Sequence, residues 1–577
     1  MSIVFRFYRT YVPRYLWWYV GGIVTLVLTN FLSVRIPVYL GRAIDAVRAG
    51  GDVTSGVLLN AGIIAAMGAV IVVVRTVSRV AFFTPGRLVE ADVKRDLFSH
   101  LLRQQPAFHQ EWSTGDLISR SSSDVGFVRM LAGFGAFGIA NTSVALVMTL
   151  GQMIQIDAKL ALWTLLPAFG ALLGVRVFIK RMFRLVHEMQ QQLSNLSDQV
   201  LSTYQGVATV KSFNAEDAFL ERFEEYNQNY LATSKERADM RALIGPMLAV
   251  GATLNVFLLL YIGGPMAIRG DISVGDLVAF TALAGFLSGP LRGASFLLSL
   301  FKQAQAALER IAAVRDPEPE RPDLPDPKPV PSTPPRIDIR GLDFAYPDAP
   351  DSPVLKDIHL SIASGSTLGV LGATGSGKTS LVRVITRQFN PPANTVFVDD
   401  TDIRQLDLDG WRQTSAVVPQ RAFLFSETVR DNILLGAPDD GRLEAVLEAT
   451  TMDVDIAALP QGVDTLVGEA GVMLSGGQRQ RTALARGLVR PHTFLVLDDV
   501  LSAVDHKTEH QLIQTMRARK GVTTVIVANR ISALQHADLV VVLDEGRIVQ
   551  RGTHEQLVAE EGHYRETWER QSDGGAK

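Results

Sequence analysis

The chain has 577 residues, which is too long for one hydrophobic core and suits several domains. Hydrophobic residues make up 47% of it and charged residues 20%, so it is more apolar than an ordinary soluble enzyme and more charged than a protein built only of membrane spans. The net charge of −3 offers no basic surface for nucleic acid, and the lack of cysteine excludes disulfides, thiolate zinc sites and cysteine nucleophiles.

Six apolar runs in the first part of the chain have about the length that crosses ~30 Å of hydrocarbon. They cover residues 15–40, 56–74, 137–156, 160–175, 242–263 and 277–300. The third and fourth runs are separated only by Asp157, Ala158 and Lys159. One such run is also compatible with a buried helix of a soluble protein, but six in series predict a helical membrane domain.

The distribution of charge predicts the orientation of these helices. Arg6, Arg9 and Arg14 precede the first run, and no acidic residue occurs before Asp45. Because positive residues are retained in the cytoplasm, we expect a cytoplasmic N-terminus in the cell (inner) membrane, and six crossings return the chain to the cytoplasm. The long charged loops, roughly 75–136 and 176–241, then face the cytoplasm and are expected to extend the helices beyond the bilayer.

A proline-rich segment follows the last apolar run. Prolines at almost every second or third position from Pro317 to Pro335 exclude a helix and predict a linker. We therefore expect a transmembrane domain over residues 1–315, a linker over 316–335 and a soluble α/β domain over 336–577.

The soluble part contains a phosphate-binding loop between a strand and a helix. The strand covers residues 368–371, and the loop that follows reads Gly372, Ala373, Thr374, Gly375, Ser376, Gly377, Lys378 and Thr379, with a helix from Ser380. Glycines let backbone N–H groups turn toward phosphate oxygens. Lys378 is expected to reach the β- and γ-phosphates of ATP, and Thr379 to offer its hydroxyl to Mg²⁺.

A second strand, residues 493–497, ends in Asp498 and Asp499. A carboxylate at the end of an apolar strand is how such domains hold Mg²⁺, so we assign Asp498 to the metal. Asp499 stands where an attacking water would be oriented, and its side chain is one methylene shorter than that of glutamate.

A glycine turn before a helix lies between these two motifs, with Ser475, Gly476, Gly477 and Gln478 at its centre. Backbone amides and a serine hydroxyl at a helix N-terminus form an anion site. Since the phosphate loop already surrounds its own nucleotide, this second site suggests a nucleotide held by another subunit.

These motifs together resemble one subunit of an ATP-binding cassette (ABC) transporter of the exporter type, in which six long helices of the type IV fold precede a phosphate-loop ATPase domain. The resemblance covers nearly the whole chain and implies ATP hydrolysis coupled to transport. It implies that Tyr346 stacks on adenine and that Gln420 contacts Mg²⁺ and senses the membrane domain. It also assigns residues 502–505 to a dimer interface, residues 114–120 and 206–211 to two coupling segments, and residues 270–275 to the start of the sixth helix. The family joins two nucleotide-binding domains head to tail, so the chain is expected to need a partner.

Two residues depart from the family pattern. Asp499 replaces the usual glutamate, and Asn529 replaces the histidine that usually precedes Arg530. Asn529 can form hydrogen bonds but carries no positive charge and shuttles no proton. A misplacement of about 1 Å can cost ~10²-fold in rate. We therefore expect a site that binds ATP and hydrolyses it poorly, in the unequal half of a heterodimer; a homodimer with slow hydrolysis is the alternative.

The expected function is export of amphipathic drugs, lipids or peptides. An importer of metal–chelator complexes with the same architecture and a regulatory ATP-binding subunit stay open as alternatives. Arg35, Arg176 and Arg292 lie in or near the spans. They either meet an anionic part of the substrate or, the interpretation we favour, extend to the membrane interface or pair between helices.

Overall fold

The structure is a computed structural model that describes residues 3–573 except 49–52, 318–325, 469–470, 472, 501–508, 510 and 515–520. Its residues divide into two compact units. The first comprises Met1–Leu101 and Gly115–Pro317, and the second comprises Leu102–Thr114 and Glu318–Lys577. The boundary at Pro317 falls within the proline-rich segment that we expected to be a linker.

The first unit is helical, and each of the six predicted spans lies in a long helix. These helices are α2 (Leu16–Arg48), α3 (Val53–Leu102), α7 (Ala136–Ile156), α8 (Ala158–Gln205), α10 (Glu216–Arg269) and α11 (Val274–Arg315). The shorter helices are α1 (Ile3–Tyr11), α5 (Thr114–Ser119), α6 (Val125–Met130) and α9 (Val207–Ser212). Within the described residues, four stretches are long and apolar enough to cross a membrane: Ile3–Arg48, Gly56–Leu102, Thr114–Ile156 and Ala249–Arg269.

The predicted break between the third and fourth spans is confirmed. Asp157 has an extended backbone (φ −159°, ψ 122°) between α7 and α8, and its carboxylate accepts a hydrogen bond of 2.7 Å from the backbone N–H of Leu160. The turn between α10 and α11 also lies where we expected it. Gly270 ends α10 with a φ of +86°, and Ser273 caps α11 through reciprocal bonds with Asp276. Both breaks are set by local capping chemistry.

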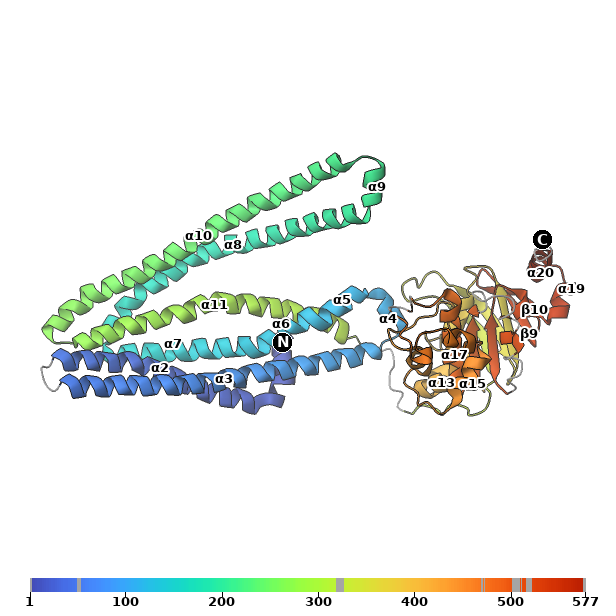
Figure 1. Ribbon diagram of the computed structural model, residues 1–577, viewed down its shortest axis with the longest axis horizontal. Helices are drawn as coiled ribbons and strands as arrows, with labels where there is room; N and C mark the ends of the chain where they lie inside the picture. The colour runs from blue at the N-terminus through green and yellow to red at the C-terminus, as the bar shows by residue number, and fades with distance from the viewer. Residues whose placement is uncertain are drawn as a thin grey trace. The chain divides into compact units, whose positions relative to one another are not determined.

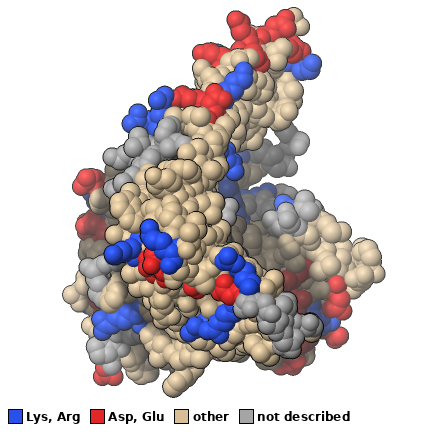
Figure 2. Space-filling model, turned by 90° about the vertical axis from the view of Figure 1, so that its left-hand side faces the viewer, with Lys and Arg blue, Asp and Glu red and all other residues tan. Residues whose placement is uncertain are grey.

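Helices α8 and α10 pack against each other as a hairpin that diverges from the neighbouring helices toward α9 (Figure 1). The α9 segment corresponds to the predicted coupling segment 206–211. At the end of the unit where α10 meets α11, uncharged surface predominates and charged side chains gather in small groups (Figure 2). The pair formed by Arg269 and Asp271, 3.1 Å apart, belongs to this connection.

The second unit contains two sheets (Figure 1). The smaller sheet has the order β2-β1-β4-β5, and the larger has the order β10-β9-β3-β8-β7-β6. The strands are β1 (Ile337–Phe344), β2 (Leu355–Ile362), β3 (Thr367–Gly372), β4 (Val396–Val398), β5 (Thr401–Asp402), β6 (Ser415–Val418), β7 (Phe494–Asp498), β8 (Thr523–Val527), β9 (Leu539–Asp544) and β10 (Arg547–Gly552). Strands β9, β3, β8, β7 and β6 run parallel, and β10 is antiparallel at the edge.

Apolar side chains cover both faces of the larger sheet. Along β7, Phe494 and Val496 join the core that includes the smaller sheet, whereas Leu495 and Leu497 join the core on the opposite face. Burial on both faces explains why this strand is a continuous apolar run. The helices of the unit are α4 (Pro106–Glu111), α12 (Lys378–Ile385), α13 (Leu408–Thr414), α14 (Val429–Leu434), α15 (Arg442–Ala449), α16 (Asp453–Ala457), α17 (Gly476–Val489), α19 (His554–Ala559) and α20 (His563–Asp573).

A segment that precedes the predicted coupling segment 114–120 belongs to the second unit. Residues 102–114 group with the second unit, where Ala107 of α4 packs against the core that contains the smaller sheet. Most of the predicted segment, residues 114–120, instead forms α5 at the start of a long helical series. Pro106, a residue that favours the first turn of a helix, begins α4, and the coupling role of residues 114–120 stays a prediction.

Candidate functional site

Three neighbouring parallel strands bring the predicted site residues together. Strand β8 lies between β3 and β7, and the carboxyl ends of all three meet at one edge of the larger sheet. The phosphate loop follows β3, Asp498 and Asp499 end β7, and Asn529 follows β8. This edge is where parallel α/β sheets bind ligands.

The phosphate loop has a backbone that requires glycine at specific positions. Gly375 and Gly377 have φ values of +86° and +104°, in the region that side-chain-bearing residues rarely adopt. A Cβ atom on Gly372 would lie 2.4 Å from the carbonyl oxygen of Leu543 and 2.5 Å from Ser376 Oγ. A side chain would therefore be strained at Gly375 and Gly377 and would have no space at Gly372, and the loop forms a tight turn before α12.

Lys378 folds back over this loop. Its ammonium group donates hydrogen bonds to the carbonyl oxygens of Gly372 (2.6 Å) and Ala373 (2.8 Å). Burial lowers the pKa of Lys378, and the nearby carboxylates of Asp499 and Asp498 oppose this effect. A phosphate group in the loop would supply the negative charge that this half-buried cation lacks.

The hydroxyl of Ser376 is a second buried donor in the loop. Ser376 is only 4% exposed, and its Oγ has no hydrogen-bond partner among the described residues. A buried hydroxyl without a partner costs free energy, so a ligand oxygen that accepts its proton would be stabilised there. The sequence analysis assigned Ser376 only to the phosphate loop, because the motif does not indicate that its side chain has a role of its own.

Asp498 and Thr379 form the candidate metal site. Asp498 is buried, and the Thr379 hydroxyl donates a hydrogen bond to its carboxylate. Burial raises the pKa of Asp498, the adjacent Asp499 raises it further, and Thr379 and Lys378 oppose the rise. A divalent cation would neutralise the two adjacent carboxylates. One carboxylate, one hydroxyl and phosphate oxygens are ligands that suit Mg²⁺, which rarely needs an all-protein cage.

Asp499 is held by two side-chain amides. Its Oδ2 accepts one hydrogen bond from Gln420 Nε2 (3.1 Å) and another from Asn529 Nδ2 (3.0 Å). The backbone of Asp499 has a φ of +51°, and its N–H donates to the carbonyl oxygen of Val527 on β8. A water molecule approaching Oδ2 would have to compete with both amides for that oxygen.

The turn that carries Asn529 is fixed from two sides. The buried Glu509 pairs with Arg530 Nη1 at 2.9 Å and accepts a bond from the Ser532 hydroxyl. Gln571 of α20 donates to the backbone carbonyl of Asn529 (2.8 Å) and accepts from the N–H of Ile531 (2.9 Å). The sequence analysis missed Glu509 and Gln571, since neither belongs to a recognisable motif.

Tyr346 packs against the phosphate-loop helix from the smaller sheet. Its hydroxyl lies 2.9 Å from Ser380 Oγ, and its ring meets Phe344 and Phe389 edge to face at centroid distances of 5.2 and 5.1 Å. Arg383 lies over the same ring, 5.8 Å from its centre. Tyr346 thus lies beside α12, next to Ser380, and its stacking on adenine stays a prediction.

The second predicted anion site forms the start of α17. Ser475 and Gln478 cap the helix reciprocally: the Gln478 N–H donates to Ser475 Oγ (3.2 Å) and the Ser475 N–H donates to Gln478 Oε1 (2.9 Å). Gln478 Nε2 and Arg481 both bind Asp455 of α16, another residue that the sequence did not single out. Within the described part of the chain, no hydrogen bond joins Ser475, Gly476, Gly477 or Gln478 to the phosphate loop.

Several predicted residues lie apart from this site or outside the described residues. The interface segment 502–505 lies outside the described residues, as do the side chains of Arg176 and Arg292. The side chain of Arg35 stacks over Phe31, 5.3 Å from the ring centre.

Comparisons with known proteins agree with this architecture. Residues 19–291 match the family described as the ABC transporter transmembrane region, and residues 355–502 match the family described as ABC transporter. The chain is 32% identical to a probable multidrug resistance ABC transporter ATP-binding/permease protein, YheI, of Bacillus subtilis, over 99% of this chain and 98% of that protein. It is 33% identical to the multidrug resistance-like ATP-binding protein MdlA of Escherichia coli, over 95% and 93% of the two chains.

Two further similarities extend the comparison to lipid transport and to a solved structure. An ATP-dependent lipid A-core flippase of Pseudomonas fluorescens is 34% identical over 82% of this chain and 79% of that protein. A solved bacterial Atm1-family ABC exporter with ATP bound superimposes with a TM-score of 0.81 at 26% identity, covering 96% of this chain and 98% of that chain.

Proposed function

The chain belongs to the ABC transporters of the exporter type, and we propose that it is the catalytically unequal subunit of a heterodimeric exporter. As a member of this family it is a multi-pass membrane protein with a cytoplasmic ATPase domain. In the proposed assembly, its own phosphate loop binds ATP but hydrolyses it slowly. Its Ser475–Gln478 segment completes the faster site on a different partner.

The observation that carries the proposal is the bonded arrangement of Asp499 and Asn529. Asp499 is shorter than glutamate, so its carboxylate stands farther from the γ-phosphate that the loop would hold. Asn529 and Gln420 both donate to the same oxygen, Oδ2. An amide cannot take up a proton as an imidazole can, so the residue beside the carboxylate offers hydrogen bonds and no general acid or base.

The other nucleotide-binding elements support ATP binding at this site. The glycines of the loop, the ammonium group of Lys378 and the carboxylate of Asp498 fit a Mg²⁺–nucleotide complex. The capped start of α17 retains its exposed Gly476 and its serine, as donation to a partner requires. Exposed apolar side chains at the tip of the α8–α10 hairpin, Tyr204, Val207 and Phe213, suit contact with a second subunit.

We propose that the transported molecules are amphipathic. The names of the related proteins refer to multidrug resistance and to a lipid A-core flippase, and both drugs of this kind and lipids combine apolar and polar parts. In the proposed cycle, ATP binding joins the two nucleotide-binding domains and turns the membrane helices outward. Hydrolysis at the faster site then resets them.

The stoichiometry of hydrolysis tests the unequal site. The transporter would be purified from its own membrane through a tag on this chain, and the ADP trapped with vanadate would be counted. We expect about one trapped ADP per transporter in the natural protein and about two after Asp499→Glu is combined with Asn529→His. The second subunit would be identified by mass spectrometry of the same sample.

Lys378→Ala in the doubly substituted chain is the matched control, because it removes phosphate binding at the restored site and should return the count to about one. Two trapped ADP molecules in the natural transporter would reject the slow site. Purification of this chain with copies of itself alone would reject the heterodimer.

A further inference from the structure

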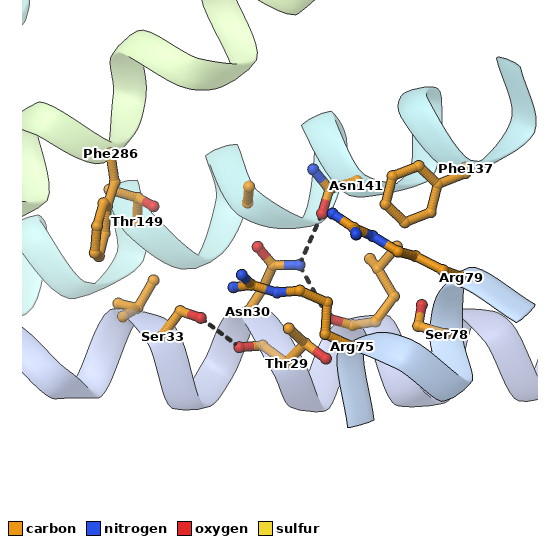
Figure 3. A pocket seen from close by; sticks show the side chains of 13 residues that line it. Thr29, Asn30, Ser33, Arg75, Ser78, Arg79, Phe137, Asn141, Thr149 and Phe286 are labelled. Carbon is orange, nitrogen blue, oxygen red and sulfur yellow. Dashed lines mark hydrogen bonds between the residues drawn. The ribbon is translucent and has the colours of Figure 1, made fainter. Parts of the chain in front are cut away.

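The helical unit contains a cavity of about 310 Å³ whose walls come from α2, α3, α7 and α11 (Figure 3). Asn30 of α2, Arg75 and Arg79 of α3 and Asn141 of α7 bring polar atoms to it. Phe137 and Phe286 add aromatic walls. Three of these helices, α2, α3 and α7, belong to stretches that are long and apolar enough to cross a membrane, and all the lining residues precede the nucleotide-binding unit in the chain.

Two arginines from one face of α3 line this cavity. Arg75 and Arg79 are four residues apart, which places their Cβ atoms ~6 Å from each other on the same side of the helix. In Figure 3 the Arg75 side chain extends over Asn30, and the Arg79 guanidinium lies beside Asn141. Both arginines belong to the stretch Gly56–Leu102, one of the four that could cross a membrane.

Neither guanidinium has an acidic partner among the described residues. The sequence extends this statement to the apolar stretches of the long helices. No Asp or Glu occurs in residues 1–44, 53–89, 125–156, 158–187, 240–270 or 277–308. Because charge in the membrane is costly without a partner, an anion from outside these helices is the group that the arginines lack.

The rest of the cavity suits a molecule with both polar and apolar parts. Asn30 Nδ2 donates a hydrogen bond of 3.2 Å to Asn141 Oδ1, which holds the two amides together on the wall (Figure 3). Leu26, Val34, Phe137 and Phe286 provide apolar surface around this polar group. The planar guanidinium forms paired hydrogen bonds to phosphate and carboxylate oxygens, so two of them favour an oxyanion over other polar groups.

We propose that this cavity binds the oxyanion headgroup, phosphate or carboxylate, of an amphipathic molecule through Arg75 and Arg79, with the apolar part against Phe137 and Phe286. This inference deepens the proposed export function and rests on it, because it assigns the class of molecule exported. Arg35, which the sequence singled out, lies on α2 and stacks over Phe31 instead of lining the cavity.

Binding of a radiolabelled amphiphile to the full-length transporter in neutral maltoside detergent tests the proposal. The probe is dodecyl phosphate, measured by scintillation proximity without nucleotide, and the competitors are dodecanoate, dodecyltrimethylammonium, phosphatidylglycerol and inorganic phosphate. We expect dodecanoate and phosphatidylglycerol to compete, the latter pointing to a membrane lipid as the source. We expect dodecyltrimethylammonium and inorganic phosphate to compete at least tenfold more weakly.

Substitution of the arginines provides a second measurement. Arg75→Gln with Arg79→Gln should weaken binding of dodecyl phosphate at least tenfold. Arg75→Lys with Arg79→Lys should give an intermediate loss, because lysine keeps the positive charge but cannot form the paired hydrogen bonds of a planar guanidinium. Arg35→Gln is the matched control, since it removes one positive charge from a position on α2 that does not line the cavity, and should leave binding within twofold of the natural protein.

Equal competition by the cationic and anionic amphiphiles would overturn the proposal without any variant having to fold. Inorganic phosphate as potent as dodecyl phosphate would reject an amphipathic ligand, and a loss in Arg35→Gln equal to that in the double glutamine variant would reject the cavity. The binding assay uses no nucleotide, so a negative result would reject the anion-binding cavity but not the unequal ATP site. In the same way, a vanadate count that rejects the unequal site would not affect the binding result.

Discussion

Asp499 and Asn529 act as one bonded unit. They are separated by 30 residues in the chain, but β7 and β8 are paired neighbours, which brings the Asn529 amide to 3.0 Å from the Asp499 carboxylate. Asp499 also has a φ of +51°, which aspartate and asparagine adopt more readily than longer side chains. The sequence analysis identified each of the two residues separately as a departure from the family pattern. Their hydrogen bond could not be predicted, because it depends on strand order and on backbone conformation.

At the same scale, the buried Tyr564 is expected to make the free energy of unfolding fall as the pH rises into the alkaline range. Its hydroxyl lies 2.8 Å from His554 Nδ1, and burial raises the pKa of Tyr564 to about 12. The folded protein therefore holds the phenolic proton more tightly than the unfolded chain, whose tyrosine titrates near ~10. The resulting stability is complete below pH ~10 and is lost as the pH rises to about 12, with a maximum of ~2.7 kcal/mol.

Tyr564→Phe removes this ionisable group, so thermal unfolding measured from pH 8 to 12 should show a weaker decline in the variant than in the natural protein. Tyr204→Phe, at an exposed position, is the control and should follow the natural curve. Parallel curves for Tyr564→Phe and the natural protein would show that the buried hydroxyl does not titrate differently on folding.

At the scale of elements, local signals predicted where helices end. Asp157 and the segment Gly270–Gly275 carry capping residues that act within one turn, so the sequence alone located both breaks. Helix α4 was missed, because its position is decided by packing of Ala107 against the core of the nucleotide-binding unit. The two π-helical segments, Arg120–Asp124 and Leu131–Gly135, were also missed. In the first, Asp124 bonds Arg310 of α11, which is a tertiary contact.

The contact between α2 and α11 predicts a specific sensitivity. A Cβ atom on Gly275 would lie 2.1 Å from the carbonyl oxygen of Gly41 and 2.4 Å from Asp45 Oδ2. Gly275→Ala should therefore separate the helices and break the 2.8 Å bond from the Gly275 N–H to Asp45. We expect a loss of ~1–3 kcal/mol, read as a lower midpoint of thermal unfolding in detergent.

Gly285→Ala on the same helix is the control, because no atom lies within 4 Å of the added methyl group. It should leave the midpoint unchanged or raise it slightly, as alanine favours a helix over glycine by up to ~1 kcal/mol. If both alanine variants unfold alike, the close approach of α2 and α11 does not govern stability.

At the scale of the whole molecule, the motifs predicted the family and the site but not the cavity. The second predicted span stopped before Arg75, because a run of apolar residues is interrupted there. In the structure α3 continues from Val53 to Leu102, and Arg75 and Arg79 line a cavity shared with α2, α7 and α11. Hydropathy treats an arginine as the end of a span. Only the arrangement of several helices reveals that it faces an interior cavity.

If the transporter is a heterodimer, two substitutions in this chain should reduce ATP hydrolysis to different extents. Gly476 lies at the exposed start of α17 with nothing within 4 Å, so Gly476→Asp fits the fold but places a negative charge where a partner's γ-phosphate would bind. In a heterodimer the Ser475–Gln478 segment of this chain serves the faster site, and Gly476→Asp should abolish ATP hydrolysis by the transporter. Lys378→Ala disables only the slow site and should leave a substantial part of the rate.

In a homodimer each chain supplies a phosphate loop and a Ser475–Gln478 segment to equivalent sites, so the two substitutions would reduce hydrolysis equally. The comparison therefore separates the two assemblies by one rate measurement on each purified transporter. Gly476→Ala is the matched control: its methyl group fits the fold of this chain and carries no charge, so it should reduce the rate less than Gly476→Asp does. A loss in Gly476→Ala as large as in Gly476→Asp would mean that bulk, and not charge at the anion site, causes the effect.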